Sequence, residues 1–335
     1  MLKSKVLSVA TLTIITLLLA SCEKDEIPVE TPTAGLVESD EVAMQSDYRN
    51  QLFYDLELGR VVSENLKTDW DLGFECTADG WRITTNTGKG MKCAHTDFTQ
   101  FNQEINITNL EWAWDSPSGN LDSTAIGNWK LEPNKLMVID RGFDWNGEAQ
   151  GYAELKILSY SETEYTIEFS ASNQDEINVF TVTKDPTRNL KCFSFNNPYS
   201  TSNYSGSSVD IQPDRNDWDL FFTQYLAELD DGDQIIPYLV VGVLTNYETS
   251  FAQQVFDIDF EEIDLEYANT LNFDSNIDNI GYDWKVYDFQ DGFITYNDRY
   301  YVIKDTEGVY FKLRFLDFYN LEGEKGHPNF ELQRL

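Results

Sequence analysis

The feature that most constrains the fold of this chain is an internal repeat. Five short segments of the first half recur in the same order in the second half. The five pairs are WDLGF (70–74) with WDLFF (218–222), ITTN (83–86) with VLTN (243–246), IGNWK (126–130) with IGYDWK (280–285), LMVID (136–140) with YYVIK (300–304), and YAELKILSY (152–160) with YFKLRFLDF (310–318). Chance could produce one such match, but five collinear matches indicate one unit that is written twice.

The recurring segments alternate in the manner of β-strands. In YFKLRFLDF, Leu313 and Phe315 fall on one face, and in YAELKILSY the same face takes Leu155 and Ile157. Runs rich in Asp, Asn and Gly, such as DDGD and LEGEKG, supply turns between them. Aromatic residues, which favour pleated sheets, make up 14% of the chain. These patterns predict an all-β protein with two related antiparallel sandwich-like halves.

The same patterns predict how the chain is divided. Its 335 residues are 41% hydrophobic, which suffices for one large domain or two small ones. We expect a signal peptide over residues 1–21, a flexible linker over 22–45, a first β unit over 46–173 and a second β unit over 174–335. The linker prediction rests on Pro28, Pro32 and Gly35 in a stretch without periodicity.

The N-terminus has the features of a bacterial export signal. Lys3 and Lys5 precede an apolar run over residues 6–19, and LASC closes it with small residues before a cysteine. This ending resembles a lipobox, which implies cleavage before Cys22 and acylation of its thiol by a chain such as palmitate. The following EKDE (23–26) resembles the export tag of surface lipoproteins in Bacteroidota, although a solvated linker could begin in the same way. We therefore expect a lipid-anchored protein of the outer membrane, facing the medium.

The net charge of −34 restricts the class of partner. Binding to nucleic acid or to anionic lipid needs clustered Lys and Arg, which this chain lacks. The acyl chain on Cys22 is then the expected contact with the bilayer.

Three cysteines remain beside Cys22, which are Cys76, Cys93 and Cys192. Outside the cytoplasm Cys76 and Cys93 could form a disulfide across a hairpin turn around ADGW. Spacing alone does not show that their thiols come within reach, so the free form stays open. Cys192, in LKCFSF, is interpreted as a small buried hydrophobe.

Two longer stretches resemble a known family. The run LFYDLELGRVVSENLKTDWDLGF with ITTNTGKG (52–90) resembles the N-terminal signature of HmuY-like lipoproteins, and the stretch over residues 284–333 resembles the closing strands of that family. The resemblance implies an all-β surface lipoprotein that captures haem and passes it to a TonB-dependent outer-membrane receptor. The apparent duplication sets this chain apart, because it implies two sites, one site or none.

The residues that could ligate a haem iron are few. The resemblance implies a second axial histidine near Trp284 to Gln290, but no His or Met stands there. The remaining candidates are Met91 and His95 in GKGMKCAH, which alternation places on one strand face, with Met137 as a partner from elsewhere. Core packing for the methionines is the alternative. His327, in EKGHPNF, is interpreted as an exposed turn histidine.

Catalysis finds little support in the sequence. There is no nucleophile motif, no metal-ligand array and no phosphate-binding glycine loop before a helix. The acidic run ELDDGDQ (228–234) lacks the spacing of a calcium loop, so no metal site is predicted. We expect a non-enzymatic binding protein, most simply for haem or a related tetrapyrrole. The alternatives are a glycan- or protein-binding module, for example through Trp81, Trp112, Trp114 and Trp145, and a scaffold without a ligand site.

Overall fold

The structure is a computed structural model that describes residues 34–171, 176–196 and 204–335. The predicted signal peptide and the acylation site at Cys22 lie outside the described residues. The strands are β1 (Glu38–Glu41), β2 (Asn50–Asp55), β3 (Arg60–Leu66), β4 (Leu72–Glu75), β5 (Ile83–Thr85), β6 (Lys92–His95), β7 (Met137–Asp140), β8 (Tyr152–Tyr160), β9 (Glu164–Ala171), β10 (Asn178–Thr183), β11 (Leu190–Ser194), β12 (Ser207–Val209), β13 (Leu220–Asp230), β14 (Ile235–Thr245), β15 (Phe251–Val255), β16 (Lys285–Asp288), β17 (Gly292–Thr295), β18 (Tyr300–Lys304), β19 (Tyr310–Tyr319) and β20 (Lys325–Arg334).

Helical elements in the described residues are short. The 3-10 turns are η1 (Thr87–Lys89), η2 (Ile107–Asn109), η3 (Leu121–Ser123), η4 (Trp129–Leu131) and η5 (Phe260–Glu262), and α2 spans Leu265–Ala268. None of the helices in the described ranges is long and apolar enough to cross a membrane. The predicted all-β class is confirmed, because antiparallel sheets form the framework.

The first lobe contains β4 to β12. One sheet has the order β10-β9-β8-β7-β6 and the other the order β12-β11-β4-β5. Apolar side chains from both sheets, including Phe74, Leu155, Phe169 and Phe193, form one buried cluster between them. The inward-facing positions of alternating strands thus make a sandwich core.

The second lobe contains β1 to β3 together with β13 to β20. Its sheets have the orders β1-β20-β19-β18-β15 and β14-β13-β2-β3, and β16 with β17 forms a separate hairpin. Tyr54, Phe222, Leu313 and Phe330 belong to the buried cluster that joins the two larger sheets. The strand order matches that of the first lobe position by position, with β13 in the place of β4 and β2 in the place of β11.

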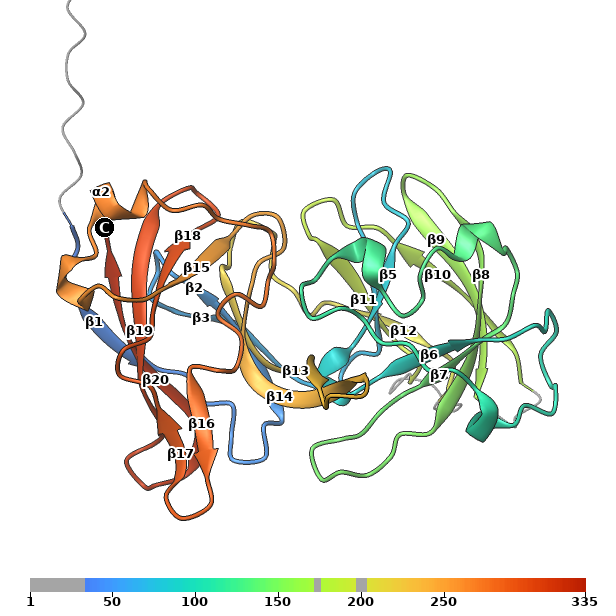
Figure 1. The fold of residues 1–335 in the computed structure, drawn as a ribbon. Helices are drawn as coiled ribbons and strands as arrows, with labels where there is room; N and C mark the ends of the chain where they lie inside the picture. Colours follow the sequence, from blue (N-terminus) through green and yellow to red (C-terminus); the bar gives the residue numbers. More distant parts are fainter. Residues whose placement is uncertain (1–33, 172–175, 197–203) are drawn as a thin grey trace, which may run out of the picture. The chain divides into compact units, whose positions relative to one another are not determined.

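The two halves of the chain exchange strands. Figure 1 shows the blue strands β1 to β3 among the orange and red strands of the second lobe. In the same way β10 to β12, which follow residue 174, pair with β9 and β4 of the first half. The predicted boundary between residues 173 and 174 lies outside the described residues, and the strands of the two predicted units do not form separate sandwiches. Each lobe needs strands from both halves, and the common ancestry of the halves stays a prediction.

The expected linker also ends earlier than predicted. Residues 38–41 form β1, which pairs with β20 in antiparallel register. Val42 and Met44 are buried in the core of the second lobe. The sequence predicts flexibility up to residue 45 because a single short strand shows no periodicity, whereas pairing with a distant strand orders residues 38–41.

Large apolar side chains at matching positions of the repeated segments lie in the core. Trp70 and Trp218 are buried, with exposed fractions of 8% and 4%, and Leu155 and Leu313 are fully buried. Both tryptophans belong to a single apolar cluster with Phe53, Cys192 and Ile211. Since Phe53 lies in β2 and Cys192 in β11, this cluster joins the two lobes.

Candidate functional site

The predicted ligand residues lie on two neighbouring strands of the first lobe. His95 in β6 is the register partner of Met137 in β7, and Met91 directly precedes β6. Met91 and Met137 are buried in the core cluster, whereas the histidine is exposed. Met91 thus packs into the core, and His95, at the end of β6, is the accessible donor.

His95 and Met137 share a small pocket. Its volume is about 200 Å³, and Trp129, Leu131 and Lys135 also line it. The Nε2 atom of His95 lies 3.3 Å from the backbone oxygen of Ala125. A ligand that takes up Nε2 must therefore replace this contact, and the flanking aromatic and aliphatic side chains supply apolar walls.

The disulfide that the sequence allowed is wrong. Cys76, Cys93 and Cys192 are all free and buried. Cys76 follows β4 in one sheet of the first lobe, whereas Cys93 lies in β6 of the other sheet, so no hairpin joins them. Burial raises the pKa of each of the three thiols, which keeps them protonated and unreactive.

His327 is not an exposed turn residue. It lies in β20, is only 8% exposed, and its Nδ1 atom is 2.8 Å from a carboxylate oxygen of Glu41. Pairing of β20 with β1 buries this side chain, which no local pattern in EKGHPNF reveals.

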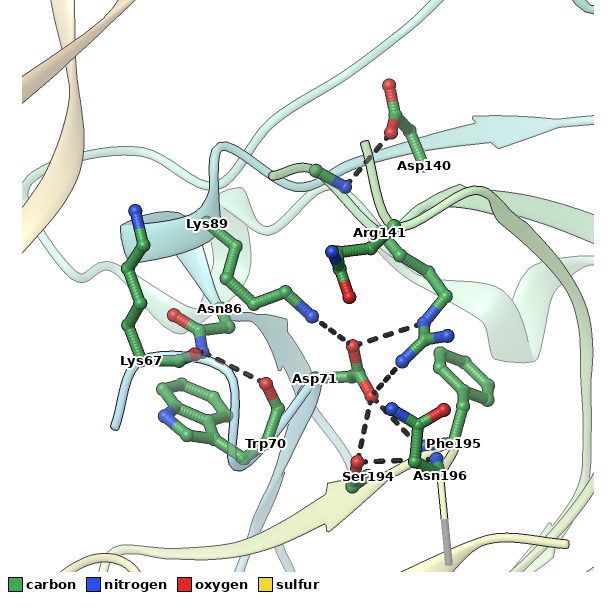
Figure 2. Close-up of polar contacts among 12 residues, drawn as sticks. Lys67, Trp70, Asp71, Asn86, Lys89, Asp140, Arg141, Ser194, Phe195 and Asn196 are labelled. Atoms are coloured by element: carbon green, nitrogen blue, oxygen red, sulfur yellow. Dashed lines mark hydrogen bonds and ion pairs between the residues drawn. The ribbon is translucent and has the colours of Figure 1, made fainter. Parts of the chain in front are cut away.

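A fully buried ionic cluster surrounds Asp71 (Figure 2). One carboxylate oxygen lies 2.5 Å from Nζ of Lys89, and the other lies 3.2 Å from the guanidinium of Arg141. The same carboxylate accepts hydrogen bonds from the hydroxyl of Ser194 and the backbone N–H of Phe195. The three charged groups, which directly precede β4, end η1 and directly follow β7, are thereby tied to the end of β11.

The charges around Asp71 determine its protonation. Burial raises its pKa, but Lys89 and Arg141 outweigh burial and lower the pKa to about 2. Burial also lowers the pKa of the Lys89 ammonium, and Asp71 opposes that shift. The cluster is therefore a charged structural network rather than a proton-transfer site, because every donor is directed at the same carboxylate.

Asp219 occupies the equivalent position of the second lobe, and no cation of the described residues pairs with it. Its carboxylate accepts the backbone N–H groups of Leu56 and Thr306, each at 2.9 Å. The place of Arg141, which follows β7, is taken by Asp305, which follows β18. Burial raises the pKa of Asp219 to about 7, and the nearby carboxyl of Asp305 adds to the shift.

A larger cavity lies where the two lobes meet. Its volume is about 340 Å³, within the usual range of ligand sites. Apolar side chains of its lining are Phe53, Trp218, Phe221 and Leu244, and charged ones are Glu75, Arg82, Asp115, Asp122, Arg215 and Glu248. The sequence did not reveal this cavity, because its walls come from segments that run from Phe53 to Ile277 and carry no shared motif.

The four tryptophans proposed for glycan stacking do not gather in one groove. All four are partly buried. Lys130 covers the ring of Trp81 at 3.7 Å, and Arg49 lies 5.4 Å from that of Trp145. Trp112 and Trp114 alone share an open pocket, with Glu228 beside them.

Metal ligands are also not clustered in the part of the chain that the structure describes. No group of three or more His, Cys, Asp or Glu side chains there could hold a metal ion.

Comparison with known proteins identifies one family. The family model described as HmuY protein matches residues 47–332. A single model therefore covers both halves of the chain together. No curated protein matches.

The solved structures that this chain resembles are distant in sequence. Apo PinO from Porphyromonas gingivitis is 10% identical, with 90% of this chain and 98% of that chain covered and a TM-score of 0.33. The apo HmuY analog of Tannerella forsythia is 11% identical, with 91% and 98% covered and a TM-score of 0.25.

Proposed function

This chain belongs to the HmuY family, and we propose that it is a non-enzymatic surface lipoprotein that captures haem or a related tetrapyrrole. The observation that supports the proposal is the family match over residues 47–332, which includes every strand from β2 to β19. Ligand capture without chemistry also suits a chain with two histidines, one of which is buried against Glu41.

His95 is the residue that we propose as the iron ligand. A haem iron takes His, Met, Cys or Tyr donors in an apolar setting. The imidazole of His95 is exposed beside Trp129 and Leu131, whereas the thioether of Met137 is 2% exposed directly across the strand pair. Met91 is fully buried behind them and is assigned to packing.

The proposed setting is the outer membrane, with the acyl chain on Cys22 as the anchor and a TonB-dependent receptor as the partner that takes over the haem. The lipobox-like LASC and the acidic EKDE support the anchor, and the family resemblance supports the receptor. Labelling with radioactive palmitate, in the wild type and in Cys22→Ala, tests the anchor.

Haemin titration of a soluble form over residues 27–335 tests the ligand. We expect a saturable shift of the Soret band that His95→Ala weakens at least tenfold, because the variant removes the iron ligand. The matched control is His327→Gln, which changes the only other histidine and should leave the titration unchanged. Equal titration curves for the wild type and His95→Ala would remove His95 from the site.

A further inference from the structure

Two half-buried tryptophans of the first lobe share an open pocket. Trp112 and Trp114 flank Ala113, whose backbone N–H and carbonyl pair with those of Cys93 in β6, each at 2.9 Å. Because the segment is extended at this pairing, both indole rings leave it on the same side. The pocket has a volume of about 450 Å³, and its other walls are Ala113, Ser116, Ser123 and Glu228.

The pocket can be reached from solvent. Both tryptophans keep part of their surface exposed, and Ala113, Ser123 and Glu228 in the same lining are exposed outright. Tyr152 supports the ring of Trp112 at 6.0 Å between centroids, and the described residues place no other aromatic ring against either indole. The pocket therefore presents indole surface to a ligand from outside.

Internal cations cover the other half-buried tryptophans of the chain. Nζ of Lys130 lies 3.7 Å from the ring of Trp81, and the guanidinium of Arg49 lies 5.4 Å from that of Trp145. Over the two rings of the open pocket, by contrast, the described residues place no Lys or Arg. Since a cation is attracted to the face of an indole ring, these two rings offer a position that an external cation can take.

The charge beside the two rings is negative. Glu228 is exposed in β13, and its carboxylate forms no ion pair with any Lys, Arg or His that the structure describes. Burial raises the pKa of Asp278, and the neighbouring carboxylates, Glu228 among them, add to the shift. Glu228 thus belongs to a wider acidic surface, which attracts cations and repels anions.

We propose that this pocket binds a small organic cation with an alkylammonium head group. The head group lies against the indole rings of Trp112 and Trp114, and the carboxylate of Glu228 compensates its charge. A neutral ligand would use the rings alone, and an anion would be repelled. The site is separate from the pocket of His95, with which it shares no lining residue.

Calorimetric titration of the soluble form over residues 27–335 with choline chloride tests whether the positive charge is recognised. We expect saturable binding of choline and of tetramethylammonium, which is the head group alone. The matched control ligand is dimethylbutanol, the neutral isostere of choline in which carbon replaces the charged nitrogen. It should bind at least tenfold more weakly, because it keeps the shape and loses the attraction to the rings and to Glu228.

Two matched pairs of variants locate the site. Trp114→Leu should weaken choline binding about tenfold, whereas Trp145→Leu, which removes a ring already covered by Arg49, should leave it unchanged. Glu228→Gln should weaken it about fivefold, whereas Glu164→Gln, which changes an exposed glutamate of β9 outside the pocket, should have no effect.

The charge variant keeps the test independent of folding, because Glu228 is exposed and its replacement leaves no buried group unpaired. The proposal is overturned if choline does not bind, if dimethylbutanol binds as tightly as choline, or if Glu228→Gln behaves as Glu164→Gln does. The Soret titration with haemin should be unchanged in Glu228→Gln, so that failure of either site is recognised separately.

Discussion

Asp71 and Asp219 follow the two equivalent tryptophans, and alternation turns them to the face opposite Trp70 and Trp218. Both aspartates are nevertheless buried, with exposed fractions of 0% and 2%. The loop after β11 and the turn after β18 cover the face that a lone strand would present to solvent. Strand alternation separates two faces, and it does not say whether one of them is solvated.

Replacement of the Asp71 carboxylate should destabilise the protein strongly. Asp71→Asn leaves Lys89 and Arg141 buried without a counter-charge, and we expect a loss of roughly 3 to 5 kcal/mol in the free energy of unfolding. Urea unfolding at pH 7 measures it. Asp219→Asn is the matched comparison and should cost less, since it removes one acceptor of a backbone N–H but leaves no described cation without its counter-charge; equal losses in the two variants would contradict the assignment.

Asp219 should make stability depend on pH in the opposite sense to Asp71. Its pKa is raised from 3.8 to about 7 in the folded state, so the folded protein binds more protons than the unfolded chain between these values. The free energy of unfolding should therefore fall as pH rises from 4 to 7. The neighbouring carboxylates of Asp305 and Asp55 also raise the pKa of Asp219. Burial raises the pKa of Asp305 itself.

Asp219→Asn should remove this dependence, because an amide keeps one acceptor and cannot ionise. Relative to the wild type, the variant should gain roughly 2 to 3 kcal/mol more at pH 8 than at pH 5. Urea unfolding at the two pH values gives the comparison. The same gain at both values would show that Asp219 stays ionised in the folded protein.

At the scale of strands, the sequence predicted the class and most of the segments. YAELKILSY is β8 and YFKLRFLDF lies in β19, because alternation and flanking turns are local properties. The exchange of β1 to β3 and β10 to β12 between the lobes could not be predicted. Equivalent strands of the two halves have similar sequences. A local pattern is therefore compatible with a partner strand from the same half and equally with one from the other half.

The shared tryptophan cluster alters what a core substitution should do. Trp70→Ala and Trp218→Ala should each cost roughly 3 to 5 kcal/mol, since each removes a large buried aromatic. Both rings pack with Phe53 and Cys192 where the two lobes meet. Each substitution should therefore lower the stability of both lobes rather than of one half alone. Amide exchange of the folded variants measures the spread, and protection lost in one lobe alone would contradict it.

The strand exchange predicts which fragment folds. Residues 67–212 contain all nine strands of the first lobe, β4 to β12, and should unfold cooperatively in urea. Residues 46–173 lack β10 to β12 and carry the β2–β3 pair without its neighbour β13, so they should not fold as a monomer. A cooperative transition in the second fragment and none in the first would mean that the halves fold separately.

At the scale of the whole molecule, the sequence could predict only those site residues that lie on neighbouring strands. His95 ends β6, in a short run that also contains Met91 and Cys93, two of the few side chains of this sequence that could ligate iron. Its partner Met137 comes from the adjacent strand β7. The cavity between the lobes was not predictable, because Trp218, Asp115 and Phe53 meet only after the strands have exchanged.

The two lobes differ at the positions of the proposed haem ligand. Their pairings place Gln254 and Tyr301 in the second lobe where His95 and Met137 stand in the first. Tyr301 is fully buried, and burial raises the pKa of its hydroxyl, which disfavours the phenolate that would bind iron. The matching architecture therefore carries one candidate iron site per chain.

The most direct test of haem capture is the stoichiometry of the Soret titration, carried out with ferric haemin and again after reduction. The account predicts a saturable shift that ends at one haemin per chain, with the endpoint lost in His95→Ala. Saturation at two haemins per chain would contradict the assignment of a single site. The absence of a Soret shift in both redox states would contradict haem capture itself.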